Sequence, residues 1–435
     1  RNTRTQLSGT PSSGRSHHCI QKAASGKKYY LWMGSKDKRV DLKILSSHRK
    51  LQVPVLGLLV LLFIGEACYI RQALLGLSVT GLSREVSWGL YIGQFVFFVG
   101  MAASAVMVVI PYALHDFKAY GQILIPAELL SIASLVACLA FVIVDLGQPI
   151  RVLNVLLYLS PSSVMFLDML VLLGYLFINL ALLRALVREH RYRVPLPIWY
   201  RPLMILSIPW AIGIHTVTAF LLSALAGRPA WLSPLLAPRF LASAFVSGPA
   251  LLVLLLLALE RQKRLRLEPS IFRGLRITIA YALAVHLFFS GVELFGILYS
   301  QTPEHLQVLS TLFTPSWLKS PSGFFLLMSC LLTVMAFVML ATKTGKSHRG
   351  LALASLAGFL GILLEKGVSL VVSGFLVTSF GANTSYFPTF NELGVVLGIW
   401  ALGALTLTFG LKRTLNADTK PAISGVVASS SPSPL

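Results

Sequence analysis

The chain has 435 residues, of which 55% are hydrophobic and only 12% charged, whereas soluble domains carry about 45–50% apolar and about 25% charged residues. Its mean hydropathy is +0.76 and its formal net charge is +21. These values exclude an ordinary soluble enzyme, a disordered protein and a nucleic-acid-binding module, and they indicate a polytopic membrane protein.

The two ends of the sequence differ from the rest in composition. Residues 1–50 are rich in Ser, Gly, Lys and Arg and have no sustained apolar pattern, which predicts a disordered basic tail without the apolar core of a signal peptide. A second low-complexity tail is expected over residues 414–435, which end in ASSSPSPL. The membrane domain is therefore expected over residues 51–413.

Ten apolar stretches follow one another between the tails. Each has roughly the 20 residues that a helix needs to cross a hydrocarbon core of about 30 Å. Spanning segments must be helices or a closed barrel, and these stretches lack the period-2 alternation of barrel strands. We therefore predict an all-α fold with ten transmembrane helices, at about 52–75, 88–111, 122–144, 163–186, 201–226, 238–259, 276–300, 322–341, 350–377 and 391–411.

The placement of Lys and Arg predicts how these helices are oriented. If the N-terminus is cytoplasmic, the cytoplasmic segments hold 30 of these residues and the outer loops hold five, namely Arg84, Arg151, Arg228, Arg239 and Lys319. Because positive residues concentrate in cytoplasmic loops, both termini are predicted to be cytoplasmic. The basic balance thus indicates topology and attraction for anionic membrane lipid, not a nucleic-acid partner.

Ionisable side chains within spans are costly in a bilayer and mark candidate functional positions. The first span carries Glu66, with Arg71 near its outer end. In the inner half of the third span, Glu128 follows a loop that contains His115 and Asp116. We expect Glu128 and this loop to form the inner station of any proton path.

Most of the other buried charges gather in the outer half of the predicted membrane. At 1.5 Å per helical residue, Glu293 and Lys366 lie roughly 25 Å from the inner face and Asp168 about 10 Å below the outer face. Each charge alone has a structural explanation, such as a helix cap or a Glu293–Lys366 ion pair. So many charged side chains at one depth favour a functional pocket. These charged residues are Glu66, Asp145, Asp168, Glu293, Glu365, Lys366 and Glu392.

The outer loop at 145–168 has the sequence DLGQPIRVLNVLLYLSPSSVMFLD. Pro149 suits the first turn of a short helix, on which Gln148, Arg151 and Asn154 recur every three residues and share one face. Such a face offers hydrogen-bond donors to a carbonyl or a headgroup. The alternative is a re-entrant structural loop whose polar groups bond one another.

Cofactor ligands are sparse. His215 and His286 lie near the middle of the fifth and seventh spans, and from facing helices they could ligate a haem. Each is the single histidine of its span, however, whereas membrane cytochromes b more often present paired histidines on the same helices. We expect no haem here; a polar pocket or proton relay and plain packing stay open for both histidines. Four scattered cysteines without a CxxC pair argue against an iron–sulfur cluster or other metal site, and no phosphate-binding motif supports nucleotide-driven transport.

Seven segments carry a longer pattern: WGLYIGQFVFFVGMAASAVMVVIPYALHDFKAYG, FVIVDLGQPIRVLNVL, SVMFLDMLVLLGYL, IHTVTAF, GRPAWLSPLLAPRFLASAFVSGPALL, LEKGVSLVVSGF and PTFNELGVVLGIWALG. Together they resemble the NrfD/polysulfide-reductase family of membrane subunits over about residues 88–410. Within that family the pattern is most similar to the DsrP-type subunits of the sulfite-reduction-associated DsrMKJOP complex and to the related subunit of the Hmc complex.

The resemblance implies a subunit without its own redox cofactor that exchanges electrons between the menaquinone pool and a ferredoxin-like iron–sulfur subunit on the outer face. It implies two four-helix bundles, for which spans 2–5 and 6–9 are the candidates. It also implies a prokaryotic cytoplasmic membrane, sulfite or sulfate respiration, and further redox partners of the cytochrome c, cytochrome b and heterodisulfide-reductase-like kinds.

A quinone carbonyl needs a hydrogen-bond donor on reduction and a base on oxidation. We assign quinone binding to Tyr91, Gln148, Arg151 and Asn154, and proton exchange to Asp145, Asp168 and the deeper His215. Weaker candidates for a proton path are Glu66, His115, Asp116, Glu128, Glu293, Glu365 and Lys366. An ion-coupled secondary transporter and a purely structural membrane anchor are the alternatives.

Overall fold

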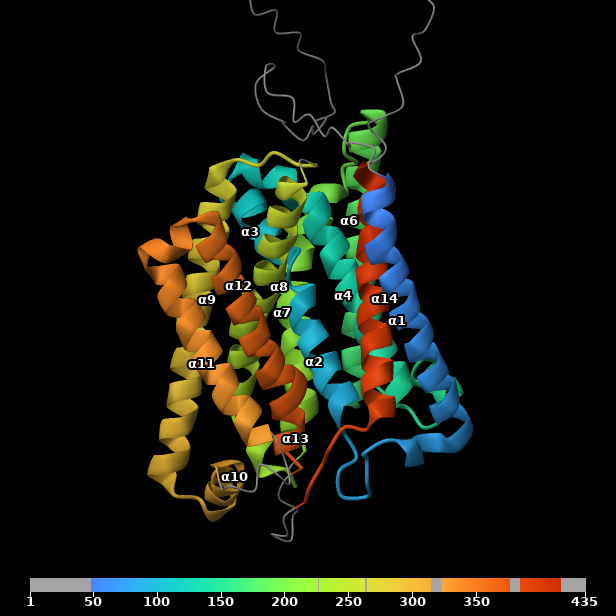
Figure 1. Ribbon diagram of the computed structural model, residues 1–435, viewed down its shortest axis with the longest axis vertical. Coiled ribbons are helices and arrows are strands. Elements are labelled where there is room, and N and C mark those ends of the chain that lie inside the picture. Colours follow the sequence, from blue (N-terminus) through green and yellow to red (C-terminus); the bar gives the residue numbers. More distant parts are fainter. Residues whose placement is uncertain (1–47, 226, 263, 314–321, 376–383, 416–435) are drawn as a thin grey trace, which may run out of the picture.

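The computed structural model describes residues 48–225, 227–262, 264–313, 322–375 and 384–415, and over these residues it is a bundle of long, roughly aligned helices (Figure 1). Ten of the described helices are long and apolar enough to cross a membrane, which confirms the predicted all-α membrane fold. The predicted tails at 1–50 and 414–435 lie almost wholly outside the described residues, since the first helix begins at His48 and the last ends at Leu415.

The spanning helices follow the order of the apolar stretches. They are α1 (His48–Leu75), α2 (Leu90–Ala102) with its continuation α3 (Val106–Leu114), α4 (Leu124–Asp145), α6 (Val164–Tyr192), α7 (Tyr200–Ser223), α8 (Leu236–Arg261), α9 (Pro269–Ser300), α11 (Ser322–Ala341), α12 (His348–Ile362) and α14 (Phe390–Leu415). The ninth span continues from α12 through a π-helical segment, η7 (Leu363–Leu370), into the short α13 (Val371–Ser373).

Two four-helix bundles form the centre of the molecule. The first consists of α2 with α3, α4, α6 and α7, and the second consists of α8, α9, α11 and α12 with η7. This arrangement agrees with the assignment of spans 2–5 and 6–9 to the two bundles. The remaining pair, α1 and α14, pack against each other, and α14 separates α1 from α4 at one edge of the molecule (Figure 1).

Small residues allow α1 and α14 to approach closely. A Cβ atom added at Gly65 would lie 2.5 Å from the Cα of Gly398, and one added at Gly394 would lie 2.6 Å from Cys68 Sγ. Without a hydrophobic driving force between helices in lipid, such close backbone contact is a main source of helix association.

The two bundles meet along α2, every residue of which is buried. It packs against both α8 and η7. Gln94 of α2 donates through Nε2 to the Gly367 carbonyl at 3.0 Å, and Trp400 Nε1 donates to Gln94 Oε1 at 2.9 Å. The side-chain amide of Gln94 thus connects the peripheral α14, the first bundle and the second bundle.

The π-helical segment η7 makes its backbone available to side chains. Wider π-helical turns leave carbonyl groups accessible, and such segments are frequent at functional sites. Besides the bond from Gln94 to Gly367, the Leu370 carbonyl accepts from Trp231 Nε1 at 2.9 Å. The same segment carries the buried Glu365 and Lys366, so its geometry positions both charged residues inside the protein.

The helix α1 begins and α14 ends at the same end of the molecule (Figure 1). We call the opposite end the far face; it holds the turns that follow α1 and α4 and the short α10 (Pro303–Phe313). The distribution of Lys and Arg predicts that the far face is the outer face of the membrane.

Candidate functional site

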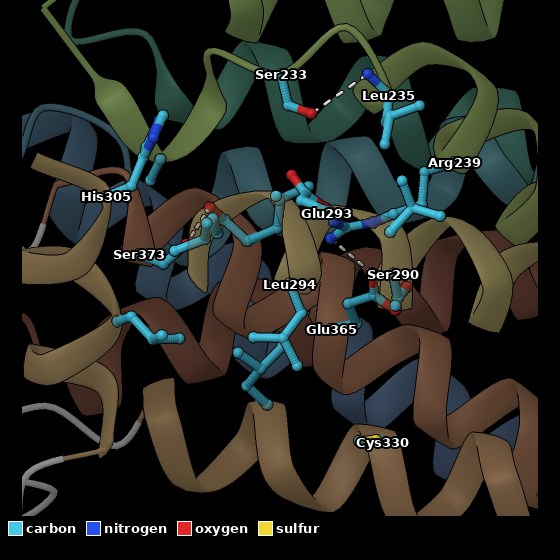
Figure 2. A pocket seen from close by; sticks show the side chains of 18 of the residues that line it. Ser233, Leu235, Arg239, Ser290, Glu293, Leu294, His305, Cys330, Glu365 and Ser373 are labelled. Atoms are coloured by element: carbon cyan, nitrogen blue, oxygen red, sulfur yellow. Dashed lines mark hydrogen bonds and ion pairs between the residues drawn. The ribbon is translucent and has the colours of Figure 1, made fainter. Parts of the chain in front are cut away.

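A cavity of about 870 Å³ lies in the second bundle. Its walls come from the segment leading into α8 and from α8, α9, α10, α11 and η7 (Figure 2). Because α10 lies at the far face (Figure 1), the cavity is on the far-face side of the bundle. Most of the lining is apolar, with a few charged groups at one place. Sites for small molecules are typically cavities of about 300–1,000 Å³ with this division of apolar walls and few polar groups.

The charged groups form one connected cluster in the cavity wall. Arg239 of α8 makes ion pairs with Glu293 of α9 and with Glu365 of η7, the latter with 2.9 Å between Nη2 and Oε1. The other oxygen of Glu365 lies 2.9 Å from His286 Nε2. Because all four residues line the cavity, its polar wall is built from three separate helical elements (Figure 2).

His286 completes the cluster. His286 is buried, and its Nδ1 has no hydrogen-bond partner among the described residues. Its Nε2 is engaged by Glu365, so Nδ1 is the ring nitrogen that remains open to another group.

Lys366 follows Glu365 in the sequence but does not join the cluster. Its Nζ donates to the Phe240 carbonyl at 3.1 Å and lies 3.9 Å above the Phe240 ring, a favourable position for an ammonium group. The possible Glu293–Lys366 ion pair is therefore wrong. The carboxylate of Glu293 pairs with Arg239 instead, because successive residues on a helix point in different directions.

Arg239 is a residue of the candidate site that sequence reasoning missed. The sequence alone places it among the charges of the outer loops, but the structure places it in the first turn of α8, with only 13% of its side chain exposed. The available signal was the excess of carboxylates at one depth, since buried carboxylates require a cation. Because Arg239 lies within a helix, it no longer counts among the positive residues of the outer loops. The predicted excess of Lys and Arg on the cytoplasmic side is therefore stronger.

Asp168 and His215 lie in the first bundle and do not line the cavity. Asp168 of α6 is buried and accepts a hydrogen bond from Thr218 Oγ1 of α7 at 2.6 Å. One turn earlier on α7, His215 is buried with Nδ1 2.5 Å from the Ala211 carbonyl, and its Nε2 has no partner among the residues that the structure describes. The two candidates for proton exchange therefore lie on neighbouring helices.

Tyr91 and Asp145 lie where α1, α2 and α4 meet. The Tyr91 hydroxyl donates to Gln72 Oε1 at 2.7 Å, and Gln72 Nε2 donates to the Val144 carbonyl at 2.7 Å. The next residue, Asp145, has a buried Oδ1 without a partner in the described part of the protein. Sequence reasoning did not single out Gln72, although a buried amide in an apolar span was a signal.

The loop after α4 forms a short helix, as Pro149 predicted. It consists of η3 (Pro149–Leu153) followed by α5 (Asn154–Leu157). Gln148, Arg151 and Asn154 are all exposed, and none of them lines the cavity. No hydrogen bond joins their side chains to one another in the described structure, so they present polar groups on the far face.

The residues predicted for an inner proton station are not one cluster. Glu128 is buried, with Oε2 lacking a partner among the described residues. His115 and Asp116 are exposed at the end of α3, and Asp116 lies 3.8 Å from Lys118 Nζ. Glu66, another candidate, lies on an exposed face of α1, away from the cavity.

Glu392 proves to be a helix cap. Its carboxylate accepts hydrogen bonds from the Gly81 and Thr389 backbone N–H groups, both at 2.8 Å, and from the Tyr386 hydroxyl at 2.7 Å. Acceptors at a helix N-terminus satisfy backbone donors that have no partner within the helix. Burial and the Glu392 charge raise the pKa of Tyr386 well above its usual value, so this phenol stays a donor.

The two membrane histidines lie on helices of different bundles. His215 belongs to the first bundle and His286 to the second, and one nitrogen of each ring is already engaged, by Ala211 and by Glu365 respectively. Over the residues that the structure describes, no group of three or more His, Cys, Asp or Glu side chains is arranged to hold a metal ion.

Comparison with known proteins connects this arrangement to one family. The family model described as polysulphide reductase, NrfD, matches residues 78–378. This range contains both four-helix bundles and leaves out α14 and all of α1, so the peripheral pair is an addition to the matched core.

Three relatives illustrate the range of similarity. A protein of Halobacterium salinarum that is named as a membrane subunit of dimethyl sulfoxide reductase is 27% identical over 420 residues, which cover 87% of this chain and 95% of the relative. The Hdr-like menaquinol oxidoreductase integral membrane subunit of Archaeoglobus fulgidus is 24% identical over 80% of this chain and 89% of its own length. A polysulfide reductase component of Wolinella succinogenes is 30% identical over 38% of this chain and 56% of its own length.

Proposed function

This chain belongs to the polysulphide reductase NrfD family, and from that premise we propose that it is the quinone-interacting membrane subunit of a multi-subunit oxidoreductase. Menaquinone is the quinone we favour, because the Archaeoglobus relative is named as a menaquinol oxidoreductase subunit. The bacterial and archaeal relatives support a prokaryotic cytoplasmic membrane. Their names favour a redox subunit over a secondary transporter or a structural anchor.

The finer assignment is to sulfur-compound respiration, with sulfite or sulfate as the terminal acceptor of the pathway. It is supported by the similarity to the Wolinella polysulfide reductase component and by the DsrP-like sequence pattern. Electrons pass between the quinone and a ferredoxin-like iron–sulfur subunit on the far face, and cytochrome and heterodisulfide-reductase-like subunits carry them further.

The observation that carries this function is the cavity in the second bundle with its ion-paired wall. A menaquinone has a flat apolar ring, two carbonyl oxygens and a long apolar tail, so it requires apolar walls with a few polar groups at one end. Leu294 of α9 and Leu327 of α11 both line the cavity and are exposed. These side chains belong both to the cavity wall and to the exposed surface of the second bundle, so an opening between the two helices would admit a quinone from lipid.

The cluster supplies the groups that quinone chemistry needs. Oxidation of a quinol would release protons, and His286 would accept one at Nδ1, while the Glu365 carboxylate accepts a hydrogen bond from Nε2–H, orients the ring and stabilises its positive charge. Arg239 compensates the charges of both carboxylates and offers further N–H donors toward a carbonyl oxygen. A proton acceptor and a hydrogen-bond donor thus lie in one wall of the cavity.

A second placement of the quinone uses the residues assigned from the sequence: Asp145, Asp168, His215, Tyr91, Gln148, Arg151 and Asn154. These residues lie in or beside the first bundle, and the exposed face of the short outer helix would then contact the headgroup or the iron–sulfur partner. The two placements differ in which carboxylate is essential for quinol oxidation: Glu365 for a quinone in the cavity, and Asp168 for a quinone in the first bundle.

Matched substitutions in the purified complex test the proposal. Glu365→Gln should lower menaquinol oxidation by about 10²-fold, the scale seen when a group that stabilises developing charge is removed. Asp168→Asn and Arg151→Lys should leave the rate within about threefold of the wild type if the quinone occupies the cavity. A large loss in Asp168→Asn and Arg151→Lys, with Glu365→Gln unaffected, would move the quinone to the first bundle. Normal rates in all three variants contradict quinone exchange by this protein.

A further inference from the structure

Glu66 lies midway along the span Pro54–Val79, and its side chain is exposed on the surface of α1. The other carboxylates in the interior of the described spans are placed differently. Glu293 is half-buried in an ion pair, and Glu128, Asp168, Glu365 and Glu392 are buried. Glu66 is therefore a carboxylate that faces the hydrocarbon core of the membrane.

The opposite side of α1 explains why Glu66 is not directed inward. Gly65 and Cys68 face α14, where they contact Gly398 and Gly394, and Gln72 is turned toward Tyr91. One residue along a helix corresponds to a rotation of about 100°, since a turn has 3.6 residues. Glu66 consequently lies on a neighbouring face, which no described helix covers.

Exposed apolar side chains continue this face in both directions. We call it the α1 seam; it consists of Leu59, Phe63, Glu66, Ile70 and Leu74, all of which are exposed. Their spacings of three and four residues are those of a helix stripe that packs against another helix. At the edge of the molecule, α1 has room for such a neighbour (Figure 1).

An ionised carboxylate is unfavourable in lipid, and acidic residues within membrane spans almost always pair with another group. Within the described structure, no hydrogen bond or ion pair reaches the Glu66 carboxylate. A purely lipid-facing seam would carry an apolar residue at this position. What the Glu66 carboxylate lacks in the described structure is a positively charged group at the same depth in the membrane.

We propose that the α1 seam docks a transmembrane helix of a partner subunit, and that this helix carries a Lys, Arg or His side chain opposite Glu66. Charge complementarity selects the partner, and the flanking apolar residues of the seam supply the packing. A single polar position in an apolar stripe fixes the register of two packed helices. The family match begins at residue 78, so α1 provides this surface outside the matched core.

The proposal rests on membership of a multi-subunit complex but not on the quinone cavity. Variants of the cavity should change turnover and leave the composition of the complex unaltered. Variants of the α1 seam should change the subunit composition of the complex, and turnover only as a consequence. The two proposals can thus fail independently.

The first test measures the subunit ratios of the complex purified from membranes. Glu66→Leu should lower the ratio of one membrane-spanning partner to this protein at least tenfold, while the amount of this protein in the membrane stays normal, because leucine is favourable in a lipid-facing helix. Glu85→Leu is the matched control, since Glu85 is an exposed carboxylate in the turn before α2. An unchanged ratio in Glu66→Leu overturns the proposal.

Two further measurements define the occupant. Glu66→Gln keeps a hydrogen-bonding side chain but loses the charge, so it should also release the partner; full retention would show a neutral donor and overturn the basic assignment. A photo-crosslinking residue at Phe63, which is 77% exposed, should yield a cross-linked apolar peptide of another subunit that contains Lys, Arg or His. Recovery of α1 itself, indicating a second copy, or of lipid alone would contradict the proposal.

Discussion

His286 of α9 and Glu365 of η7 lie 2.9 Å apart between Nε2 and Oε2, although 79 residues separate them in the sequence. The same carboxylate also accepts from Arg239 of α8. One side chain thus connects three helical elements and lines the cavity of the second bundle. The cluster has a structural role and a chemical role at once, and variants must be chosen so that the two can be separated.

Replacement of Arg239 should destabilise the second bundle. Arg239→Ala leaves Glu293 and Glu365 without their cation in a largely buried place, and removal of one partner from such a pair costs about 3–5 kcal/mol. We expect a lower Tm of the purified protein, measured by thermal unfolding. Arg151→Ala is the control, because an exposed substitution of this kind changes stability by about 0.5 kcal/mol or less. Equal Tm values for both variants would contradict the ion-pair geometry.

The contact between α1 and α14 should be sensitive to a single methyl group. In Gly65→Ala the new Cβ would lie 2.5 Å from Gly398 Cα, and overpacking of this kind costs about 1–3 kcal/mol. Gly57→Ala on the same helix meets nothing within 4 Å and should be neutral or slightly stabilising. Thermal unfolding of the two variants side by side checks this; a stable Gly65→Ala protein would show that the helices separate.

The orientation of the protein in the membrane follows from the distribution of Lys and Arg. Reporter fusions in the loop after α6, at 193–199, and in the loop after α8, at 264–268, should report the cytoplasm. A fusion at 227–235, between α7 and α8, should report the outer side. Reversed reporter signals would show that the positive-inside rule fails for this protein and that the far face is cytoplasmic.

The purified protein should show no haem Soret band. His215 and His286 belong to different bundles, and each has one ring nitrogen engaged by a protein group. Absorbance spectra of the reduced and oxidised protein provide the measurement. A Soret band that disappears in His215→Ala and His286→Ala would mean that these histidines ligate haem after all.

Sequence reasoning was successful where the signal is local. Apolar runs of membrane-crossing length predicted ten spanning helices, which the structure confirms, because lipid forces each span to satisfy its own backbone hydrogen bonds. Pro149 predicted a short helix after α4, and a helix cap was among the structural explanations for the single charges, which is the role that Glu392 has. The family pattern, with its two bundles at spans 2–5 and 6–9, was also readable from the sequence.

The tertiary structure alone decided which charges meet. Arg239 looked like a loop charge, and a Glu293–Lys366 pair looked possible, because helix boundaries are uncertain by a turn and hydropathy gives depth without direction. The rotation of each helix about its axis, and the π-helical segment that turns Glu365 toward Arg239 and His286, depend on packing between elements distant in sequence. Glu66 shows the same limit: its depth was predictable, but its exposure followed only once Gly65 was seen to face α14, because neighbouring residues on a helix point to different surfaces.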